Sequence, residues 1–543
     1  MRSISRVLAC LNPLAIVGLA LCLSASGVRV FAFEQQQPPA PVLPPPAPAP
    51  QPSQPTGPEL RLSADEAVRM ALENNLGVKA ERLGPQIGTY GVAQARAQYA
   101  PSLFSNSTKR NSTTPPDILA SGGLGSTSTS DRVQTNLGLQ QFIPWGGGRY
   151  NVSLDASRQA TNTISSFNPQ LGSNLSAQLV QPLLRNFKID AFRQQVLVAK
   201  KNEDIASLQL RQRMVSTDSA VRNAYYNLVG ALGQLDVSRQ SLDLSRESLR
   251  QNERRVEVGV MARIDIIEAQ AEVARVEESV ISAETLIRTY EDALRTLVLN
   301  PAQADFWTVR LVPSERPVLT PKQVDVEAAT RNALANRTDL LEARARLEST
   351  DINLRYTRNQ KLPSVDLIAN YNTVGVAGTG ISYEPGSYPP VEAGRSQRAF
   401  SEALRDVFGN NFKTWSVQLQ VNYPMGTSPA EAGLAAGRLQ REQQVTALQE
   451  LEVQIAASVR DAGRQVSSSL QRVEATRKAR EFAEIRLDAE QKRITAGLAS
   501  TFQLLNAQQA LSNAKQQENR AIIDYNRALV NFEAVQAAPL GGR

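Results

Sequence analysis

The sequence predicts a mainly α-helical fold with a membrane β-barrel, built from one structural unit that occurs twice. Three observations predict it. Long stretches rich in Ala, Gln, Glu and Arg are typical of helices, a few short segments alternate strictly between apolar and polar residues, and similar segments recur at constant offsets. A chain of 543 residues is long enough for several domains. The recurring segments therefore indicate how the chain is divided into structural units.

The first 32 residues have the pattern of a secretory signal peptide. Arg2 and Arg6 precede an apolar run at 11–23, and Val30-Phe31-Ala32 offers a small-residue cleavage site. A membrane anchor is the alternative interpretation. Pro13 interrupts the apolar run, however, and a bilayer span needs about 20 apolar residues. We expect the segment to be cleaved.

Both cysteines, Cys10 and Cys22, lie in this segment, and the chain has no histidine. We therefore expect no disulfide, no thiolate or imidazole metal site and no nucleophile–histidine catalysis in the mature protein. No glycine loop that could cradle phosphate is present. The net charge of +7 is spread over mixed charges rather than gathered in a basic stripe, which argues against a nucleic-acid partner. No catalytic residue, cofactor or metal is expected.

A proline-rich segment, residues 33–58, follows the expected signal peptide. Proline fixes φ and lacks a backbone donor, so this segment should form an extended tether rather than helix or sheet. Regular structure should begin near residue 62. There Ser63 can cap a helix, with Glu66 three residues later.

An internal repeat divides the rest of the chain. EAVRMALENN from Glu66 and EAATRNALANR from Glu327 share an Ala-Leu pair 262 positions apart (Ala71 to Ala333), and the same offset carries Pro101-Ser102 onto Pro363-Ser364. GVMARIDIIEAQAE from Gly259 similarly matches GLASTFQLLNAQQA from Gly497, 238 positions later. The expected organisation is signal peptide 1–32, tether 33–58, first repeat 59–300, linker 301–320, second repeat 321–538 and C-terminal tail 539–543.

Each repeat has the same expected order of elements. A helix of about 33 residues ends at Pro101 or Pro363, and strands follow. A helix of about 70 residues comes next, at 186–257 or 427–495, and spans about 105 Å at 1.5 Å per residue. A glycine turn then reverses the chain into a last helix of about 35 residues. The first and last helices could stack end to end beside the long one.

The strand signal is clearest in WSVQLQVNY, where apolar residues alternate with Ser, Gln and Asn. We expect a lipid-facing side made of Trp415, Val417, Leu419, Val421 and Tyr423. Comparable segments begin at Ser102, Leu175 and Val365. An ordinary half-buried sheet is the alternative, but four strands beside long helices would make a poor core. Four strands cannot close a barrel alone, whereas three chains would supply 12 strands.

Residues 136–157 resemble an additional hairpin around Gly146-Gly147-Gly148. Three placements are open: it enlarges the barrel, replaces the weakly alternating strand near Ser102, or forms an extracellular or equatorial flap. Twelve strands in the trimer are the default expectation.

The chain from about residue 60 to 538 resembles the TolC-like outer-membrane efflux protein family. The resemblance rests on the repeat, the Pro-Ser pairs, the strand ends QPLL and NYPMG, and the two glycine-turn segments. It implies a homotrimer in the cell outer membrane, with a 12-stranded barrel among lipids and a long α-helical tunnel through the periplasm. It also implies a passive exit duct for efflux or type I secretion. A periplasmic adaptor (membrane fusion) protein would dock to it, and an inner-membrane transporter would drive export.

The resemblance also implies roles for the residues around the two glycine turns. They would form the periplasmic tips that meet the adaptor, although a plain interhelical turn is the alternative. The expected tip residues are Val258, Gly259, Val260, Met261, Ala262, Ala496, Gly497, Leu498, Ala499 and Ser500.

Carboxylates just past such tips often line the constriction of the family's tunnel. Asp265 and Glu268 have this position in the first repeat, three residues apart on one helix face, while Gln503 and Asn506 replace them in the second. Rings of three carboxylates in a trimer would favour cations. A solvated outer face, or a tie to Arg263, is the alternative.

Two other function classes compete with the export duct. The first is a structural periplasmic coiled-coil protein that uses its helices as spacers and has no pore. Strand alternation separates the two, because a spacer does not need it. The second is an enzyme, which we do not expect because no catalytic constellation is present.

Overall fold

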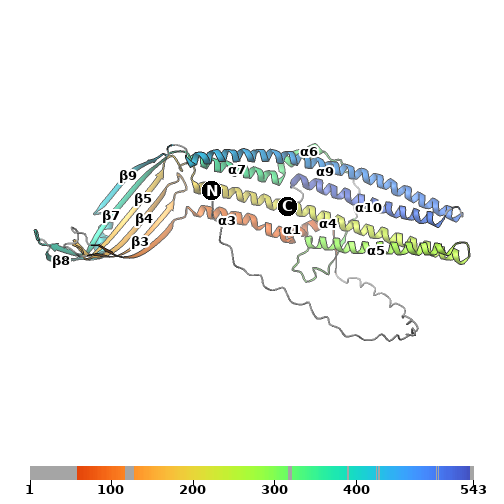
Figure 1. Ribbon diagram of the computed structural model, residues 1–543, viewed down its shortest axis with the longest axis horizontal. Coiled ribbons are helices and arrows are strands. Elements are labelled where there is room, and N and C mark those ends of the chain that lie inside the picture. The colour runs from red at the N-terminus through yellow and green to blue at the C-terminus, as the bar shows by residue number, and fades with distance from the viewer. Residues whose placement is uncertain are drawn as a thin grey trace, which may run out of the picture. The chain divides into compact units, whose positions relative to one another are not determined.

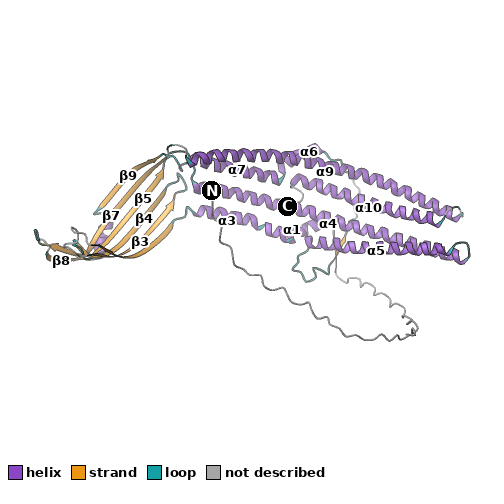
Figure 2. Ribbon diagram, in the orientation of Figure 1, coloured by secondary structure: helices purple, strands orange, loops and turns teal. Residues whose placement is uncertain are grey.

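The computed structural model describes residues 58–538 except 116–126, 316–320, 388–390, 424, 426–427, 497 and 499. The expected signal peptide, all but the last residue of the expected tether, the tail 539–543, Gly497 and Ala499 therefore lie outside the described residues. All of the described residues belong to the second of two units of the chain, Pro55–Arg543. Everything below concerns the second unit, which consists of long helices and one large antiparallel sheet (Figures 1 and 2).

The first helix expected in each repeat is interrupted rather than continuous. In the first repeat the helices are α1 (Ala64–Asn74), α2 (Leu76–Glu81) and α3 (Leu83–Ala97). In the second they are α6 (Val326–Asn336) and α7 (Thr338–Gln360). The breaks lie at Asn75 and Arg337, whose ψ angles of 124° and 130° are not helical. The expectation of one unbroken helix is therefore wrong, although the helices do end just before Pro101 and Pro363.

The long helices are α4 (Ala191–Glu257) and α9 (Pro429–Thr495), each of 67 residues. Asp190 and Ser428 cap them by accepting the backbone N–H groups of Arg193 and Glu431. The returning helices are α5 (Arg263–Val298) and α10 (Thr501–Ala537). Within the described part of the chain, no helix is both long enough and apolar enough to cross a membrane.

The helices lie four abreast. Near the sheet, α4 packs between α3 and α7, and α9 packs against the other side of α7. Farther along, α4 packs between α5 and α10, and α9 against α10. Each half of this arrangement is one long helix beside two shorter ones, as the helix lengths predict. At both levels the outermost helices have one side without a neighbouring helix among the described residues: α3 or α5 at one edge, and α9 at the other.

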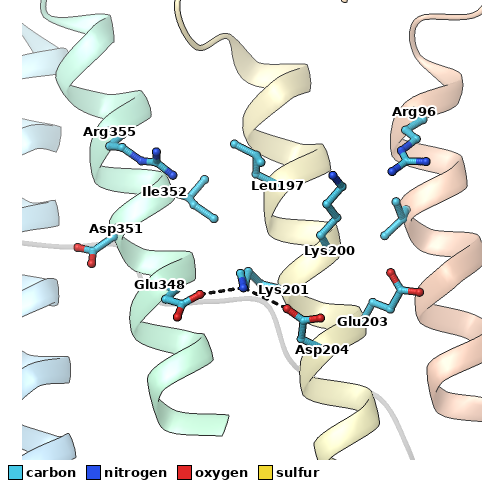
Figure 3. A pocket seen from close by; sticks show the side chains of 11 residues that line it. Arg96, Leu197, Lys200, Lys201, Glu203, Asp204, Glu348, Asp351, Ile352 and Arg355 are labelled. Atoms are coloured by element: carbon cyan, nitrogen blue, oxygen red, sulfur yellow. Dashed lines mark hydrogen bonds and ion pairs between the residues drawn. The ribbon is translucent and has the colours of Figure 1, made fainter. Parts of the chain in front are cut away.

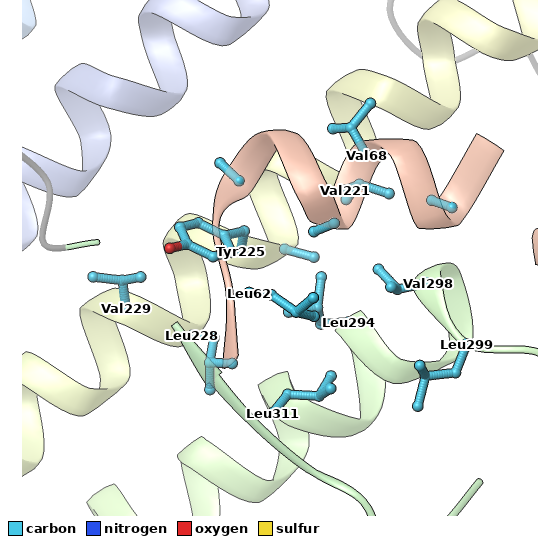
Figure 4. Close-up of a cluster of buried hydrophobic side chains, with 14 of the residues drawn as sticks. Leu62, Val68, Val221, Tyr225, Leu228, Val229, Leu294, Val298, Leu299 and Leu311 are labelled. Carbon is cyan, nitrogen blue, oxygen red and sulfur yellow. The ribbon is translucent and has the colours of Figure 1, made fainter. Parts of the chain in front are cut away.

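Two apolar clusters hold the helix pairs together at the level of the breaks. In the first, Leu62, Val221, Tyr225, Leu294 and Val298 are buried together (Figure 4). Strand β1 (Glu59–Leu62) brings Leu62 there by pairing in parallel with β6 (Arg310–Pro313) of the inter-repeat linker. The second cluster has the corresponding place in the other repeat, with Leu340, Ile455, Val459, Tyr525 and Phe532 among its members.

One antiparallel sheet contains all the other strands, in the order β2-β3-β4-β5-β7, with both β8 and β9 on the far side of β7. Their bounds are β2 Ser102–Thr114, β3 Ser128–Phe142, β4 Arg149–Thr161, β5 Phe167–Pro182, β7 Ser364–Tyr383, β8 Glu392–Arg398 and β9 Lys413–Asn422. The short helix α8 (Phe400–Phe408) lies between β8 and β9 in the chain.

The hairpin expected at residues 136–157 is part of this sheet. Strands β3 and β4 pair with each other over 13 residue pairs, and they insert between β2 and β5. Of the three open placements, enlargement of the sheet is therefore the one observed. The sequence predicts two to three β-hairpins per chain, and the large sheet has three among its long strands: β2-β3, β4-β5 and β7-β9. The default of four strands per chain, on which the expectation of 12 strands rests, is not what is observed, because this sheet contains six long strands and the shorter β8.

Candidate channel surfaces: the sheet faces, the free edges and the helical tips

The six long strands are in a register that gives the sheet one apolar and one polar face. Residues that pair across strands point to the same side, and successive residues alternate between sides. One row across the strands is apolar throughout: Leu103, Leu139, Val152, Ala177, Tyr371 and Trp415. The adjacent row is polar throughout: Ser102, Gln140, Asn151, Gln178, Asn370 and Ser416.

The apolar face is largely uncovered in one chain. Trp415 is 71% exposed, and Val417, Leu419 and Val421 on the same side of β9 are also exposed. Tyr423 lies just beyond the end of the strand and is exposed too. Monomeric soluble proteins rarely expose a contiguous apolar surface of this extent. All five residues expected to face lipid are thus uncovered, and the four within β9 share the face of the apolar row.

The polar face carries side-chain hydrogen bonds from strand to strand. Gln178 Nε2 donates to Asn370 Oδ1 at 2.9 Å, and Asn370 Nδ2 donates to Ser416 Oγ at 3.3 Å. Ser153 and Ser176 hydroxyls lie 2.8 Å apart on the same face. Amides and hydroxyls can exchange hydrogen bonds with water as readily as with one another. This face is therefore suited to line an aqueous passage.

The sheet ends in two strands with one unpaired side each. Among the described strands, β2 pairs only with β3, and β9 pairs only with β7. The helical layer also has two uncovered edges. Its edge helices α3 and α9 expose large apolar side chains, including Ile87, Tyr90, Leu439 and Val453. Unpaired strand edges are templates for pairing with another chain.

The turn after α4 has the backbone geometry of a glycine-terminated helix. Gly259 has a φ of +77°, and its N–H donates to Val256 O at 3.0 Å, while Val260 N–H donates to Arg255 O at 2.9 Å. The second repeat has the corresponding bond from Leu498 N–H to Arg493 O at 2.8 Å. Both long helices therefore reverse through similar tight turns.

The expected tip residues surround these turns, and most are exposed. Val260 is 74% and Leu498 71% exposed, and Val258 is comparable. Gly259, Ala262, Ala496 and Ser500 are exposed as well, whereas Met261 is partly buried. The sequence reasoning did not include three further exposed apolar residues one turn beyond: Ile264, Ile267 and Phe502. The apolar residues that follow each glycine turn in the sequence would have indicated these three positions.

The four residues expected at the constriction are near the tips but differ between repeats. Asp265 is partly buried in the first turn of α5, and Glu268 is exposed one turn later. Gln503 and Asn506 are exposed at the equivalent positions of α10. Gln503 has an additional structural task, because its Oε1 accepts the Ser500 N–H at 3.1 Å and so caps the helix.

A charged groove of about 520 Å³ lies between α3, α4 and α7 (Figure 3). Lys201 of α4 bridges Glu348 of α7 at 2.8 Å and Asp204 at 3.1 Å. The hydrogen bond with Glu348, followed by that with Asp204, raises the pKa of the Lys201 ammonium above its usual value. The groove lining contains opposite charges that pair across helices, and no metal-binding group of His, Cys, Asp and Glu occurs in the described residues. The Lys201–Glu348 ion pair in this groove ties α4 to α7.

Known proteins resemble this chain in sequence and in fold. The outer membrane efflux protein family matches residues 148–298 and 329–536. Outer membrane protein TolC of Escherichia coli is 22% identical over 325 residues, which are 58% of this chain. This chain spans only 59% of the length of TolC.

Solved structures of a membrane protein and of two outer membrane channels have the same fold. A membrane protein from Pseudomonas aeruginosa is 17% identical, with a TM-score of 0.62 over 88% of this chain and 90% of that one. The Campylobacter jejuni CmeC outer membrane channel is 16% identical, with a TM-score of 0.60 over 87% and 85% of the two chains. The open state of the Neisseria gonorrhoeae MtrE outer membrane channel is 16% identical, with a TM-score of 0.59 over 88% and 89%.

The TolC-like resemblance expected from the sequence is therefore confirmed. The family match covers well over half of the chain, and it includes both glycine turns and both long helices. The chain belongs to the outer membrane efflux protein family and is a protein of the outer membrane with a large periplasmic part.

Proposed function

We propose that three copies of this chain form a passive exit duct through the outer membrane. The observation that carries the proposal is the sheet, which combines an exposed apolar face, a polar face and two unpaired edge strands. A bilayer provides no hydrogen-bond partners for strand edges, so such a sheet must close with other copies. Closure by pairing β9 of one copy with β2 of the next would put the apolar face on lipid and the polar face on the lumen.

The strand count follows from the sheet of one chain. Three copies of the six long strands give a barrel of 18 strands rather than 12. Barrel diameter grows roughly linearly with strand number, so this barrel would be about 1.5 times as wide as one of 12 strands. The four helices abreast in each copy would give a ring of twelve in the periplasmic tunnel.

The tips would meet the other components of the export machine. An exposed apolar group around Val258, Val260 and Leu498 suits packing against a periplasmic adaptor protein. The adaptor would connect the duct to an inner-membrane transporter, which supplies the energy. Rings of Asp265 and Glu268 from three copies would form the narrow, cation-favouring part of the lumen. Residues 59–300 and 321–538 would be the two structural repeats, joined by the linker 301–320.

A periplasmic spacer without a pore is the alternative function. The apolar face around Trp415 argues against it, because a spacer in water would leave that face uncovered. The polar face, with its amide and hydroxyl side chains, is a second feature that supports a conduit.

Disulfide cross-linking tests the shared barrel directly. The only cysteines, Cys10 and Cys22, lie in the expected signal peptide, so introduced cysteines would have no competitors. Asn106 of β2, changed to Cys, would be combined in turn with Cys at positions on the polar side of β9: Thr414, Ser416, Gln418 and Gln420. Oxidation in outer-membrane fractions should give covalent dimers and trimers for at least one pair.

The matched control uses the same cysteine with a partner in its own chain. Asn106 pairs in register with Asn136 of β3, so Asn106→Cys with Asn136→Cys should cross-link without a change in mass. A native trimer in detergent and ion conductance after reconstitution would complete the test. A water-soluble monomer that cross-links only in the control would contradict the duct and favour the spacer.

A further inference from the structure

Helix α8 packs against the sheet through one side only. Ala403 and Val407 are fully buried, while Phe408 on its other side is 69% exposed. Thr373 Oγ1 of β7 donates to Val407 O at 3.3 Å. Gly375 approaches so closely that an added Cβ would lie 2.0 Å from Ala403 O. The helix is therefore seated firmly on β7.

The side of the sheet that α8 covers is the apolar one. Thr373 and Gly375 alternate in phase with Tyr371, which pairs with Trp415 in the apolar row. The carbonyl of Phe412 also accepts the Val374 N–H at 3.1 Å, which holds the turn after α8 against β7. The helix and its turn thus lie on the face that the duct would present to lipid, and away from the lumen.

The height of α8 on the barrel follows from strand geometry. Thr373 is nine residues beyond Ser364, where β7 begins beside the helices. At about 3.3 Å per residue and a tilt of about 40°, this corresponds to about 23 Å along the barrel axis. The apolar band of outer-membrane barrels is about 25 Å tall. The C-terminal end of helix α8, where Val407 contacts Thr373, therefore lies where the strand leaves the hydrocarbon region, at the leaflet farther from the periplasm.

Aromatic and basic side chains are both exposed at this level. Phe408, Phe412 and Trp415 expose their rings. Arg405 and Lys413 are exposed and form no ion pair or side-chain hydrogen bond within the described residues, although Arg405 also attracts the Asp406 carboxylate electrostatically. Nearby acidic groups are already engaged, because Arg398 binds Glu402 and Asp406 at 3.0 Å each. Two exposed cations outside any ion pair, beside exposed rings, match a lipid with an anionic head and apolar chains.

We propose that α8 and the turn to Lys413 form a binding site for anionic, phosphate-bearing lipid of the outer leaflet. Arg405 and Lys413 contact the phosphate, and Phe408 and Phe412 pack on the acyl chains. The site rests on the proposed duct, since it needs the apolar face to be in a bilayer. It anchors the outer rim of each copy at a fixed height in the membrane.

Trp415 provides a direct reporter for this site. The chain has three tryptophans, so a Trp145→Phe and Trp307→Phe background leaves Trp415 as the only one. The trimer would be placed in nanodiscs of phosphatidylcholine with a fraction of brominated phosphatidic acid, whose bromines quench nearby tryptophan. Brominated phosphatidylcholine at the same fraction measures contact without charge. We expect stronger quenching by the anionic lipid, equivalent to a preference of about five-fold or more.

Charge variants separate recognition from general lipid contact. Arg405→Gln with Lys413→Gln should abolish the preference, while Arg405→Lys with Lys413→Arg should keep it. Arg132→Gln is the matched control, because Arg132 is an exposed cation on the polar face and its loss should leave the preference unchanged. Equal quenching by both lipids in the parent, or an unchanged preference in the double Gln variant, would overturn the site. Trimer mass and conductance of the same samples are read first, so a failed duct is recognised separately.

Discussion

The guanidinium of Arg337 donates through Nη1 to the carbonyl oxygen of Val535 at 3.1 Å, where the first helix of the second repeat breaks. In the first repeat, Asn75 Nδ2 donates to Leu297 O at 3.3 Å. Asn75 and Arg337 are 262 positions apart, and Leu297 and Val535 are 238 apart, which are the offsets of the sequence repeat. Both repeats thus fasten the break in their first helix to the end of their last helix, with chemically different side chains.

Replacement of Arg337 should destabilise the protein strongly. Arg337 is buried, and it also binds the partly buried Asp339 at 2.9 Å, so Arg337→Met would leave that carboxylate and a carbonyl without the guanidinium that they share. We expect a loss of about 3 kcal/mol in the free energy of unfolding. Asn75→Ala removes only neutral hydrogen bonds and should cost about 1 kcal/mol. Denaturant unfolding of both variants measures the difference, and equal effects would contradict this account of the break.

A larger residue at Gly375 should displace α8. Gly375→Val would put side-chain atoms where the Ala403 carbonyl lies. Ala369→Val is the control, because Ala369 is on the same face of β7 but is nearer to Ser364 than the residues that contact α8. We expect residues 391–412 to become sensitive to added protease in intact outer membranes only in the first variant. Protection of the segment in Gly375→Val would show that α8 has another support.

Much of the helical organisation could be predicted because glycine and proline act locally. Pro101 and Pro363 end helices, and Gly259 supplies the positive φ of a tight turn, whatever surrounds them. The breaks at Asn75 and Arg337 could not be predicted with equal ease. The helical pattern continues through both positions, and the break is stabilised by carbonyls more than 190 residues away in the chain.

The surfaces of the candidate channel were predictable to a similar degree. Alternation alone defined the apolar side of β9, because side-chain period in a strand is two residues. Pairing of β3 and β4 with their neighbours depends on partners distant in sequence, which local pattern does not specify. Helix α8 was not expected, because its nine residues lie between two strands and their sequence alone does not show that they pack on Gly375.

Lys201 should contribute to stability in a pH-dependent way. Its pKa is raised, chiefly by the hydrogen bond with Glu348, so its contribution is complete below the usual lysine pKa of about 10.4 and is lost as pH rises through the raised value. Lys201→Met should lower stability by up to about 1 kcal/mol at pH 8, because the side chain is partly exposed.

The neighbouring lysine gives the control for this prediction. Lys200 is exposed and lines the same groove, and Lys200→Met should leave thermal stability at pH 8 nearly unchanged. Thermal unfolding at pH 8 and above pH 11 should show the gap between parent and Lys201→Met narrowing at the higher pH. A stability difference that widens at the higher pH would contradict a stabilising role for protonated Lys201.

Two glycine-to-alanine changes should have opposite effects. Gly259→Ala places a Cβ at a φ of +77° and should destabilise the first tip by about 1–2 kcal/mol, although the added atom meets nothing within 4 Å. Gly433 lies inside α9, where an added Cβ makes only an ordinary contact with Thr357, so Gly433→Ala should stabilise its helix by about 0.5–1 kcal/mol. Hydrogen exchange of the two segments reads each effect locally. Faster exchange in both variants would mean that Gly433 has a packing role.

The charge of the constriction should set ion selectivity. If Asp265 and Glu268 of three copies face the lumen, Asp265→Asn with Glu268→Gln removes six carboxylates from its narrowest part, since each copy contributes two. The reversal potential of reconstituted channels under a KCl gradient should then shift toward zero, with the cation-to-anion permeability ratio falling by about twofold or more.

The second repeat allows the reverse change to be made in the same protein. Gln503→Glu with Asn506→Glu introduces carboxylates at the equivalent places of α10, and a glutamate at 503 can still accept the Ser500 N–H that Gln503 accepts at 3.1 Å. The permeability ratio should rise in this variant. Opposite shifts in the two variants require both pairs of positions to face the conducted ions. If neither variant moves the reversal potential while conductance persists, these side chains point outward, and the constriction must be formed by other residues of the tips.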